Sequence, residues 1–310
     1  MQTVPLDFIR GRRKRADELP RQPKPAWLKV RAPGSENYHR LKGMMRTLGL
    51  HTVCEEANCP NIGECWNHGT ATFMILGDTC TRSCGYCNVT HGTPKPADRQ
   101  EPVRVARAIH AMALTYVVIT SVDRDDLADC GASHFARTIA ETRERIPACR
   151  IEVLIPDFKG DEAALHAVLD ARPDVLNHNI ETVPRLYRTA RPGGRYERAL
   201  QLLDRSRTYA PGIPTKSGLM VGLGEEWDEV VSTLRDMRHA GCQIVTIGQY
   251  LRPSLANLEM ARYYSPAEFA DLKGVALDMG FGHVESGPLV RSSYHAHEQT
   301  QSFEQAAPRS

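Results

Sequence analysis

Short apolar runs alternate with amphipathic stretches from about residue 71 to residue 279, and this alternation is the feature that most restricts the fold. The apolar runs predict six strands, at residues 71–76, 115–121, 150–155, 174–180, 215–221 and 243–250. The stretches between and after them predict six helices, at residues 102–113, 133–145, 161–171, 195–209, 226–240 and 266–279. Six βα units in series predict an α/β fold with a parallel sheet that is buried on both faces. Periodicity alone leaves open whether this sheet closes into a barrel.

The composition agrees with a folded α/β protein and excludes several other classes. The chain has 310 residues, of which 41% are hydrophobic, so it can bury a sizeable core as one large domain or two small ones. No fraction is extreme, which excludes a disordered chain, a collagen and a disulfide-rich miniprotein. Lys and Arg number 39 against 37 Asp and Glu, and a net charge of +2 does not indicate a nucleic-acid partner. The longest uncharged apolar stretch, residues 111–122, is too short to cross a membrane.

The first thirty residues are basic, with eight Lys and Arg against three Asp and Glu. Such a run is typical of a solvated tail, and a docking arm for an acidic partner is the alternative. The segment has no apolar core of a secretion signal, and Asp7, Asp17 and Glu18 argue against an organellar transit peptide. We therefore expect a cytoplasmic protein. A short helix is expected at residues 38–48, followed by a loop-like stretch at residues 54–69.

Six of the nine cysteines fall between residues 54 and 87, and clustered cytosolic thiols are typical of metal binding or catalysis. The downstream triad follows the first predicted strand with the spacing Cys-x3-Cys-x2-Cys: Cys80, Cys84 and Cys87. Three thiolates on so short a loop can bind one metal centre. They would leave one iron of a four-iron cluster without a protein ligand, and an open position allows chemistry. A zinc knuckle completed by His68 or His91 is the alternative.

A second set of thiols, the upstream triad, has a looser Cys-x4-Cys-x5-Cys spacing: Cys54, Cys59 and Cys65. It needs a fourth ligand from elsewhere in the chain. Taken alone, these thiols could be incidental, but beside the downstream triad they indicate a second cluster. The other cysteines have no partner at ligand spacing and are expected to be small buried apolar residues: Cys130, Cys149 and Cys242.

The downstream triad, with aromatic Tyr86 before its last cysteine, resembles the signature of the radical S-adenosylmethionine (SAM) superfamily. Both triads in this order, together with Arg291-Ser292-Ser293-Tyr294, resemble the lipoyl synthase family, over about residues 25–296. The resemblance implies a partial (β/α)6 TIM-type barrel at residues 71–284. It also implies an N-terminal extension at residues 1–70, which carries an auxiliary-cluster loop, and a C-terminal strap at residues 285–310.

That resemblance implies a sulfurtransferase of lipoate biosynthesis and protein lipoylation, which inserts sulfur at carbons 6 and 8 of an octanoyl chain on a lysine of a carrier domain. Those C–H bonds are far too weakly acidic for a side-chain base, so a radical route is needed. The implied cofactors are two 4Fe-4S clusters and SAM, with the auxiliary cluster as the sulfur donor. The implied partners are octanoylated lipoyl domains of 2-oxoacid dehydrogenases or the glycine cleavage H protein, an electron donor such as ferredoxin or flavodoxin, and an iron-sulfur carrier.

By the same resemblance, the downstream triad binds the SAM-associated cluster, and the upstream triad with Ser293 binds the auxiliary cluster. Arg291 joins Ser293 as a catalytic residue. Polar residues crowd the carboxyl ends of the predicted strands, where sites form in parallel α/β folds. There the resemblance implies these SAM contacts: Tyr86, Thr120, Ser121, Asp123, Asn179, Glu181, Arg191, Lys216, Gln249 and Tyr250. His178 is expected to be satisfied inside the barrel rather than to act as a general base.

Three rival functions predict different sequences. Another sulfur inserter, such as a biotin synthase, would carry the ligands of its second cluster on barrel strands and would lack the Arg-Ser-Ser-Tyr motif. A two-cluster electron carrier needs eight ligands on a compact chain. A structural zinc protein would bind its metal through four ligands.

Overall fold

A computed structural model describes residues 23–28, 34–56, 59, 61–62, 64, 72–296 and 298–300 of the chain. The basic N-terminal run, Cys65 and His68 therefore lie outside the described residues. The strands are β1 (His51–Thr52), β2 (Thr72–Ile75), β3 (Thr79–Cys80), β4 (Thr90–His91), β5 (Tyr116–Ser121), β6 (Arg150–Leu154), β7 (Val175–Asn177), β8 (Thr215–Val221), β9 (Ile244–Gln249) and β10 (His283–Gly287). The helices are η2 (Ala26–Leu28), α1 (Glu36–Leu48), α2 (Val53–Glu56), α4 (Glu101–Ala111), α5 (Ala132–Arg145), η3 (Phe158–Gly160), α6 (Glu162–Asp170), α7 (Pro184–Ala190), α8 (Tyr196–Tyr209), α9 (Trp227–His239) and α10 (Pro266–Asp278).

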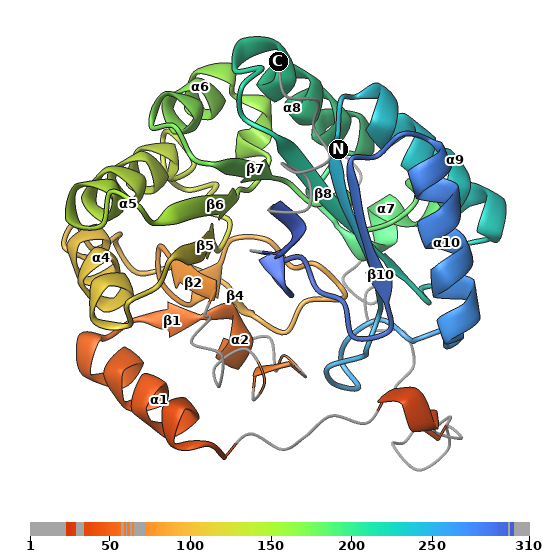
Figure 1. Ribbon diagram of the computed structural model, residues 1–310, viewed down its shortest axis with the longest axis horizontal. Coiled ribbons are helices and arrows are strands. Elements are labelled where there is room, and N and C mark those ends of the chain that lie inside the picture. Colours follow the sequence, from red (N-terminus) through yellow and green to blue (C-terminus); the bar gives the residue numbers. More distant parts are fainter. Residues whose placement is uncertain are drawn as a thin grey trace, which may run out of the picture.

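One curved sheet organises the described part of the chain. Its strand order is β1-β2-β5-β6-β7-β8-β9-β10, and every neighbouring pair is parallel except β1 with β2. The sheet does not close, because β1 and β10 remain its two edges. Figure 1 shows it as an arc with the helices on the outside, while the last described residues, in dark blue, lie inside the arc. This open arc confirms the predicted partial barrel.

Alternating residues along each strand separate an apolar outer layer from a polar interior. On β6, Ile151 and Val153 belong to the apolar cluster that packs under α4, α5 and α6, whereas Glu152 between them faces the inside of the arc. A second apolar cluster lies under α8, α9 and α10. Each fully buried Ile, Leu or Phe in these layers contributes about 1.5–3 kcal/mol.

Local sequence fixes where the outer helices begin. At α10, Ser265 Oγ accepts a hydrogen bond from Glu268 N at 3.2 Å, and the Glu268 carboxylate accepts one from Ser265 N at 2.8 Å. This capping box gives partners to the backbone N–H groups of Ser265 and Glu268. Pro266, at the first helical position, has no N–H group that would need a partner. The helix therefore begins where the sequence predicts it.

All six predicted strands and all six predicted helices are present, with ends that differ by at most three residues. The helix expected at residues 38–48 is also present, as α1. Several elements were not predicted: the short β1, β3, β4, η2 and η3, and also β10, α7 and α2, the last within the stretch expected to be loop-like. β10 has one strongly apolar residue, Val284, and it forms because its backbone pairs with β9 in parallel register. Pairing with a neighbour that is distant in sequence leaves no periodic signal.

Candidate functional site

The downstream triad lies in the loop between β2 and α4, at the carboxyl end of the sheet. Hydrogen bonds fix this loop to two segments that are far away in sequence. Gly85 N donates to Ala190 O, at the end of α7, at 2.8 Å. Asn257 Nδ2 donates to Cys87 O at 2.8 Å. The sheet edge that the sequence predicts as the site thus holds all three cysteines.

The surroundings of these thiols suit a metal-bound thiolate. Burial raises the pKa of Cys80 to about 11 and that of Cys84 to about 12, and the Asp123 carboxylate adds to both shifts. Such thiols stay protonated at neutral pH unless a metal replaces the proton. The backbone N–H groups of Arg82 and Asp123 donate to Cys80 Sγ at 3.4 and 3.3 Å, and such donors tune iron-sulfur clusters. The three thiols and their donors therefore fit a cluster.

Among the described residues, no three His, Cys, Asp or Glu side chains lie close enough to hold a single metal ion. His91, one of the two proposed zinc ligands, is exposed on β4.

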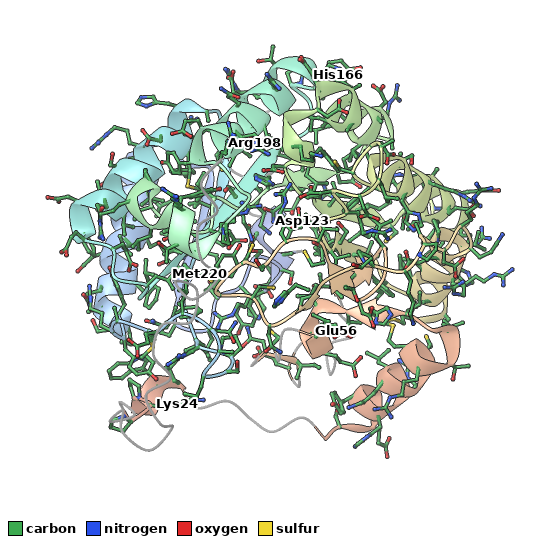
Figure 2. All side chains as sticks on the ribbon, turned by 180° about the vertical axis from the view of Figure 1, so that it is seen from behind. Lys24, Glu56, Asp123, His166, Arg198 and Met220 are labelled. Carbon is green, nitrogen blue, oxygen red and sulfur yellow. The ribbon has the colours of Figure 1, made fainter. Side chains whose placement is uncertain are left out.

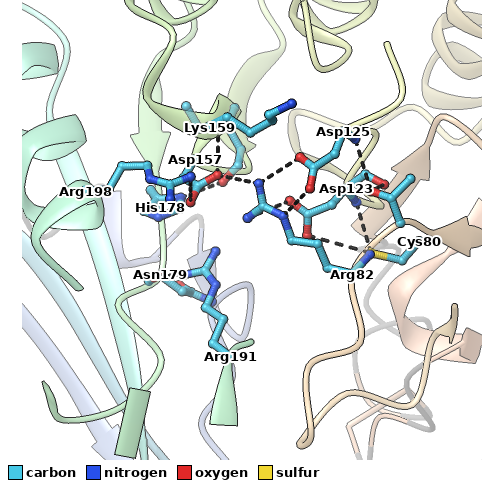
Figure 3. Close-up of polar contacts among 12 residues, drawn as sticks. Cys80, Arg82, Asp123, Asp125, Asp157, Lys159, His178, Asn179, Arg191 and Arg198 are labelled. Atoms are coloured by element: carbon cyan, nitrogen blue, oxygen red, sulfur yellow. Dashed lines mark hydrogen bonds and ion pairs between the residues drawn. The ribbon is translucent and has the colours of Figure 1, made fainter. Parts of the chain in front are cut away.

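Arg82, inside the cysteine motif, binds carboxylates from two strand ends (Figure 3). Its Nε and Nη2 donate to the two oxygens of Asp125 at 2.7 and 2.8 Å, and Nη2 also donates to Asp157 at 2.7 Å. Its Nη1 lies 3.4 Å from Asp123 Oδ1. Arg198 approaches the other oxygen of Asp157 at 3.2 Å. Only 4% of the Arg82 side chain is exposed, so these pairs are shielded from water and hold the cysteine loop against β5 and β6.

Sequence reasoning missed this cluster. Asp157 comes two residues after the third predicted strand, and Arg82 separates two candidate ligands, so both positions carried a usable signal. The Arg82 guanidinium lowers the pKa of Asp157 to about 2 against the opposing effect of burial. Asp157 is therefore a permanent anion that orients Arg82.

Buried hydrogen-bonding atoms without partners lie beside the downstream triad. Ser121 Oγ and Asp123 Oδ1 are buried and form no hydrogen bond with another described residue. Burial raises the pKa of Asp123, although Arg82 and Arg191 act in the opposite direction. Unsatisfied buried groups are costly, so this side of the site suits a ligand with polar donors and acceptors. Thr120 differs, because its hydroxyl donates to Leu154 O at 2.8 Å.

Four more predicted residues meet across the site from Asp123. Arg191 Nη1 donates to Asn179 O at 2.8 Å, and Asn179 Nδ2 donates to Glu181 Oε1 at 3.3 Å. Burial raises the pKa of Glu181, while the charge of Arg191 and hydrogen bonds from Asn179 and Tyr86 lower it. Glu181 also has a φ of 71°, a left-handed conformation that is uncommon outside glycine. The predicted Tyr86, Asn179, Glu181 and Arg191 thus form one polar wall.

The remaining predicted SAM contacts have partners within the fold. Lys216 Nζ lies 2.9 and 3.1 Å from the two oxygens of Glu152, and both side chains are almost fully buried inside the arc. Gln249 Nε2 donates to three backbone carbonyls, and its Oε1 accepts from Tyr264 N at 2.8 Å. Tyr250 Oη donates to Leu258 O at 2.8 Å. The structure therefore does not join these three side chains to the wall of Arg191 and Glu181.

The isolated cysteines are buried, as expected, whereas His178 is buried but has a partner in the described part of the chain for only one of its two ring nitrogens, so the expectation that it is satisfied is met only in part. His178 Nδ1 donates to Ile155 O at 2.8 Å, while Nε2 has no hydrogen-bond partner among the described residues. Burial, together with the charge of Arg191, lowers the pKa of His178 to about 4. The imidazole is therefore neutral at pH 7. The three isolated cysteines are at most 5% exposed: Cys130, Cys149 and Cys242.

The strap lies against the segment of the upstream triad, although the two are more than 200 residues apart in sequence. Asn61 Nδ2 donates to Leu289 O at 2.7 Å, and Tyr294 Oη donates to Glu64 at 3.2 Å. Cys54 is buried in α2 and Cys59 is half-buried, whereas the third member of the triad lies outside the described residues. The upstream segment also touches the downstream loop, since Asn88 Nδ2 of that loop donates to Glu56 O of the upstream segment at 3.0 Å.

One residue of the Arg-Ser-Ser-Tyr motif acts electrostatically on Cys59. Burial raises the pKa of Cys59, and the positive charge of Arg291 acts in the opposite direction. Burial also lowers the pKa of Arg291 itself. Ser293 lies two residues further along the strap, in a turn, and is half-buried. The motif thus brings the Arg291 cation close to Cys59, and the role of Ser293 stays a prediction.

Comparison with known proteins identifies this arrangement. A model of the radical SAM superfamily matches residues 74–237, and a model of the N-terminal domain of lipoyl synthase matches residues 6–59. The lipoyl synthase of Rubrobacter xylanophilus is 57% identical over 303 residues, which cover 98% of this chain and 93% of the relative. This chain belongs to the lipoyl synthase family. The lipoyl synthase of Thiobacillus denitrificans is 58% identical over 280 residues, which cover 90% of each chain.

Solved structures support the fold of this lipoyl synthase family member. Methylornithine synthase is similar with a TM-score of 0.53 at 14% identity, over 85% of this chain and 82% of that one. Streptococcus suis SuiB bound to S-adenosylmethionine has a TM-score of 0.52 at 11% identity, over 70% of this chain and 50% of that one. In the described portion of the chain, every helix is too short or too polar to span a membrane.

Proposed function

We propose that this chain is a lipoyl synthase in which Cys80, Cys84 and Cys87 bind the SAM-associated 4Fe-4S cluster. The upstream triad and Ser293 would bind the auxiliary 4Fe-4S cluster, which is consumed as the sulfur source. When bound, the first cluster and SAM supply a carbon-centred radical that can remove hydrogen from carbons 6 and 8 of a protein-bound octanoyl-lysine. The observation that carries this assignment is the contact of the strap with the upstream segment beside the downstream loop.

Each wall of the site has a task in this proposal. Asp123 and Ser121 offer unsatisfied oxygens that suit the SAM amino group, and the Arg191 guanidinium suits its carboxylate. Arg82 fixes the cysteine loop, so that the three thiolates face the same space as those oxygens.

The division of the chain follows from these roles. Residues 1–70 would form the extension that carries the auxiliary ligands, residues 71–284 the partial barrel, and residues 285–310 the strap that supplies Ser293. Octanoylated lipoyl domains or an H protein would present the substrate arm. A ferredoxin or flavodoxin would deliver electrons, and an iron-sulfur carrier would rebuild the auxiliary cluster. A cytoplasmic location follows from the use of reduced cysteines.

The decisive experiment is mass analysis of an octanoylated lipoyl-domain peptide after anaerobic incubation with reconstituted protein, SAM and reductant. The product should gain two sulfur atoms and lose two hydrogens. Cys84→Ala should abolish both SAM cleavage and product, because the SAM-associated cluster, which carries the open iron, loses one of its three protein ligands. Cys59→Ala should keep SAM cleavage but give no sulfur insertion. Lipoyl product from Cys59→Ala would contradict the auxiliary cluster as the sulfur donor.

A further inference from the structure

The strap crosses the inside of the barrel at two glycines. A Cβ at Gly248, on β9, would collide with the carbonyl oxygen of Val290. A Cβ at Gly218, on β8, would collide with the Thr246 hydroxyl of β9 and come within 3.0 Å of Asn179 Oδ1, while Ser292 Oγ would lie at 3.4 Å. Gly248 therefore makes room for the strap, whose path there is set by close backbone packing rather than by loose contact, and Gly218 makes room for the side chains of the barrel wall that Ser292 contacts.

At this crossing, Ser292 pairs with Asn179, two residues after the end of β7. Asn179 Nδ2 donates to Ser292 Oγ at 2.7 Å, and Ser292 Oγ lies 3.0 Å from Asn179 Oδ1 as a donor. Arg191 fixes Asn179 in turn through its backbone carbonyl at 2.8 Å. The resemblance implies that Asn179 contacts SAM, yet its Nδ2 and Oδ1 atoms both pair with Ser292 of the strap, and Nδ2 also donates to Glu181.

Ser293 is thereby bracketed by two anchors on opposite walls. On one side, Ser292 is tied to Asn179 on the barrel. On the other side, Tyr294 Oη donates to Glu64 in the segment of the upstream triad, at 3.2 Å. A residue between two fixed neighbours has a fixed backbone position, so its Cβ is placed and its hydroxyl can occupy only the few staggered rotamers that this backbone allows. The hydroxyl of Ser293 remains unbonded among the described residues while its neighbours are held.

We infer that Ser292 is a positioning residue, whose hydrogen bond to Asn179 holds Ser293 in place as a ligand of the auxiliary cluster. This inference rests on the proposed function, since it assigns Ser293 to that cluster. Ser292 itself does not touch the cluster in this scheme. It acts by linking the strap to the wall that carries Asn179 and Arg191, so the two reaction sites share one anchor.

The first test uses the full-length apoprotein and needs no cluster. Ser292→Ala should speed amide hydrogen exchange in residues 288–295 roughly tenfold, because a buried hydrogen bond no longer opposes local opening. The matched control is Ser286→Ala on β10, which loses a serine-to-carbonyl bond of 2.8 Å to Phe269 outside the crossing. Its strap should exchange at the wild-type rate. Equal exchange in both variants would show that the Asn179 pair does not hold the strap.

The second test reads the cluster directly by Mössbauer spectroscopy after anaerobic reconstitution. In a Cys84→Ala background, only the auxiliary cluster remains, and Ser293→Ala gives the spectrum of a cluster without its oxygen ligand. Ser292→Ala should bind the same iron but give the Ser293→Ala spectrum, whereas Ser286→Ala should give the parent spectrum. A parent spectrum from Ser292→Ala would overturn the positioning role. If Ser293→Ala itself leaves the spectrum unchanged, the ligand assignment of the proposed function fails instead.

Gly248→Ala provides an independent variant. It leaves Ser292 and Asn179 intact but pushes the strap away at Val290. Its strap should exchange faster, and its Mössbauer spectrum should also lose the oxygen-ligated iron. Retention of that signal in a protein whose strap exchanges faster would show that strap position does not determine ligation.

Discussion

The buried pair of Lys216 and Glu152 allows a prediction that separates a structural role from a role in SAM binding. Lys216→Met would leave the Glu152 carboxylate, which is 0% exposed, without its counter-ion. At the 2.9 Å separation of this pair, an effective dielectric constant of about 20 gives an attraction of about 6 kcal/mol. Desolvation offsets part of this attraction, and breaking a buried pair costs about 3–5 kcal/mol.

Neutral partners do not replace the lost charge. Tyr116 Oη and Asn177 Nδ2 donate to the Glu152 carboxylate at 2.8 and 2.9 Å, so its oxygens stay hydrogen-bonded in the variant. What is lost is the charge of Lys216, and the free energy of unfolding should therefore fall by about 3–5 kcal/mol. The double variant Lys216→Met/Glu152→Gln removes both charges and should regain most of that loss.

Urea unfolding of the apoprotein, followed by circular dichroism, measures these free energies in a double-mutant cycle. Lys273→Met, at an exposed position of α10, is the matched control and should change the free energy of unfolding by less than about 0.5 kcal/mol. Calorimetry of SAM binding to the reconstituted protein completes the assay. Lys216→Met with unchanged stability and weakened SAM binding would refute the structural role and restore Lys216 as a ligand of the SAM carboxylate.

Four further outcomes are expected. Anaerobic reconstitution should load about eight irons per chain, and Cys54→Ala should load about four, since in the proposed function each triad holds one four-iron cluster. An iron content that Cys54→Ala leaves unchanged would contradict a cluster at the upstream triad. Ser293→Ala should impair sulfur insertion more than SAM cleavage, and chromatography of both products checks this, with normal turnover refuting the ligand assignment. His178 has a pKa of about 4 when folded against about 6.5 when unfolded, so protonation of the unfolded state should remove about 2 kcal/mol of stability between pH 7.5 and pH 5. His178→Gln should flatten this pH dependence in urea unfolding, and an unaltered slope would contradict it. Arg82→Met should lower the affinity for cluster iron and destabilise the apoprotein by about 1.5–3 kcal/mol, because buried Asp157 loses one of its two arginine partners and keeps Arg198, and unchanged melting would contradict the role of the pair.

The order of strands and helices could be predicted because each barrel strand and its following helix carry their own periodic signal. The sheet edge that holds the site could also be predicted, since parallel strands place their carboxyl ends together. The resemblance implies SAM contacts by Asp123, Asn179, Glu181 and Arg191 at this edge. The structure places the charges of Asp123, Glu181 and Arg191 close enough to act on Cys84, and their contact with SAM stays a prediction.

Partners that depend on strand register could not be predicted. Lys216 and Glu152 are 64 residues apart, and they meet because alternate residues of β6 and β8 face the same interior. The Arg82 cluster likewise depends on how the cysteine loop folds over two strand ends. A lysine or arginine at a strand end has the same sequence signature whether it binds a ligand or a buried carboxylate, so only the fold distinguishes the two.

The contact of Asn61 with Leu289 spans 228 positions of the chain and has a consequence for biosynthesis. A polypeptide leaves the ribosome from its amino end, so Asn61 emerges first, and 228 further residues must be translated before Leu289 can reach it. A product truncated after Cys65 but before Leu289 keeps the upstream triad but lacks Ser293, the ligand that the proposed function adds to it. Under that proposal, the auxiliary cluster can acquire its full ligand set only after the strap has been translated.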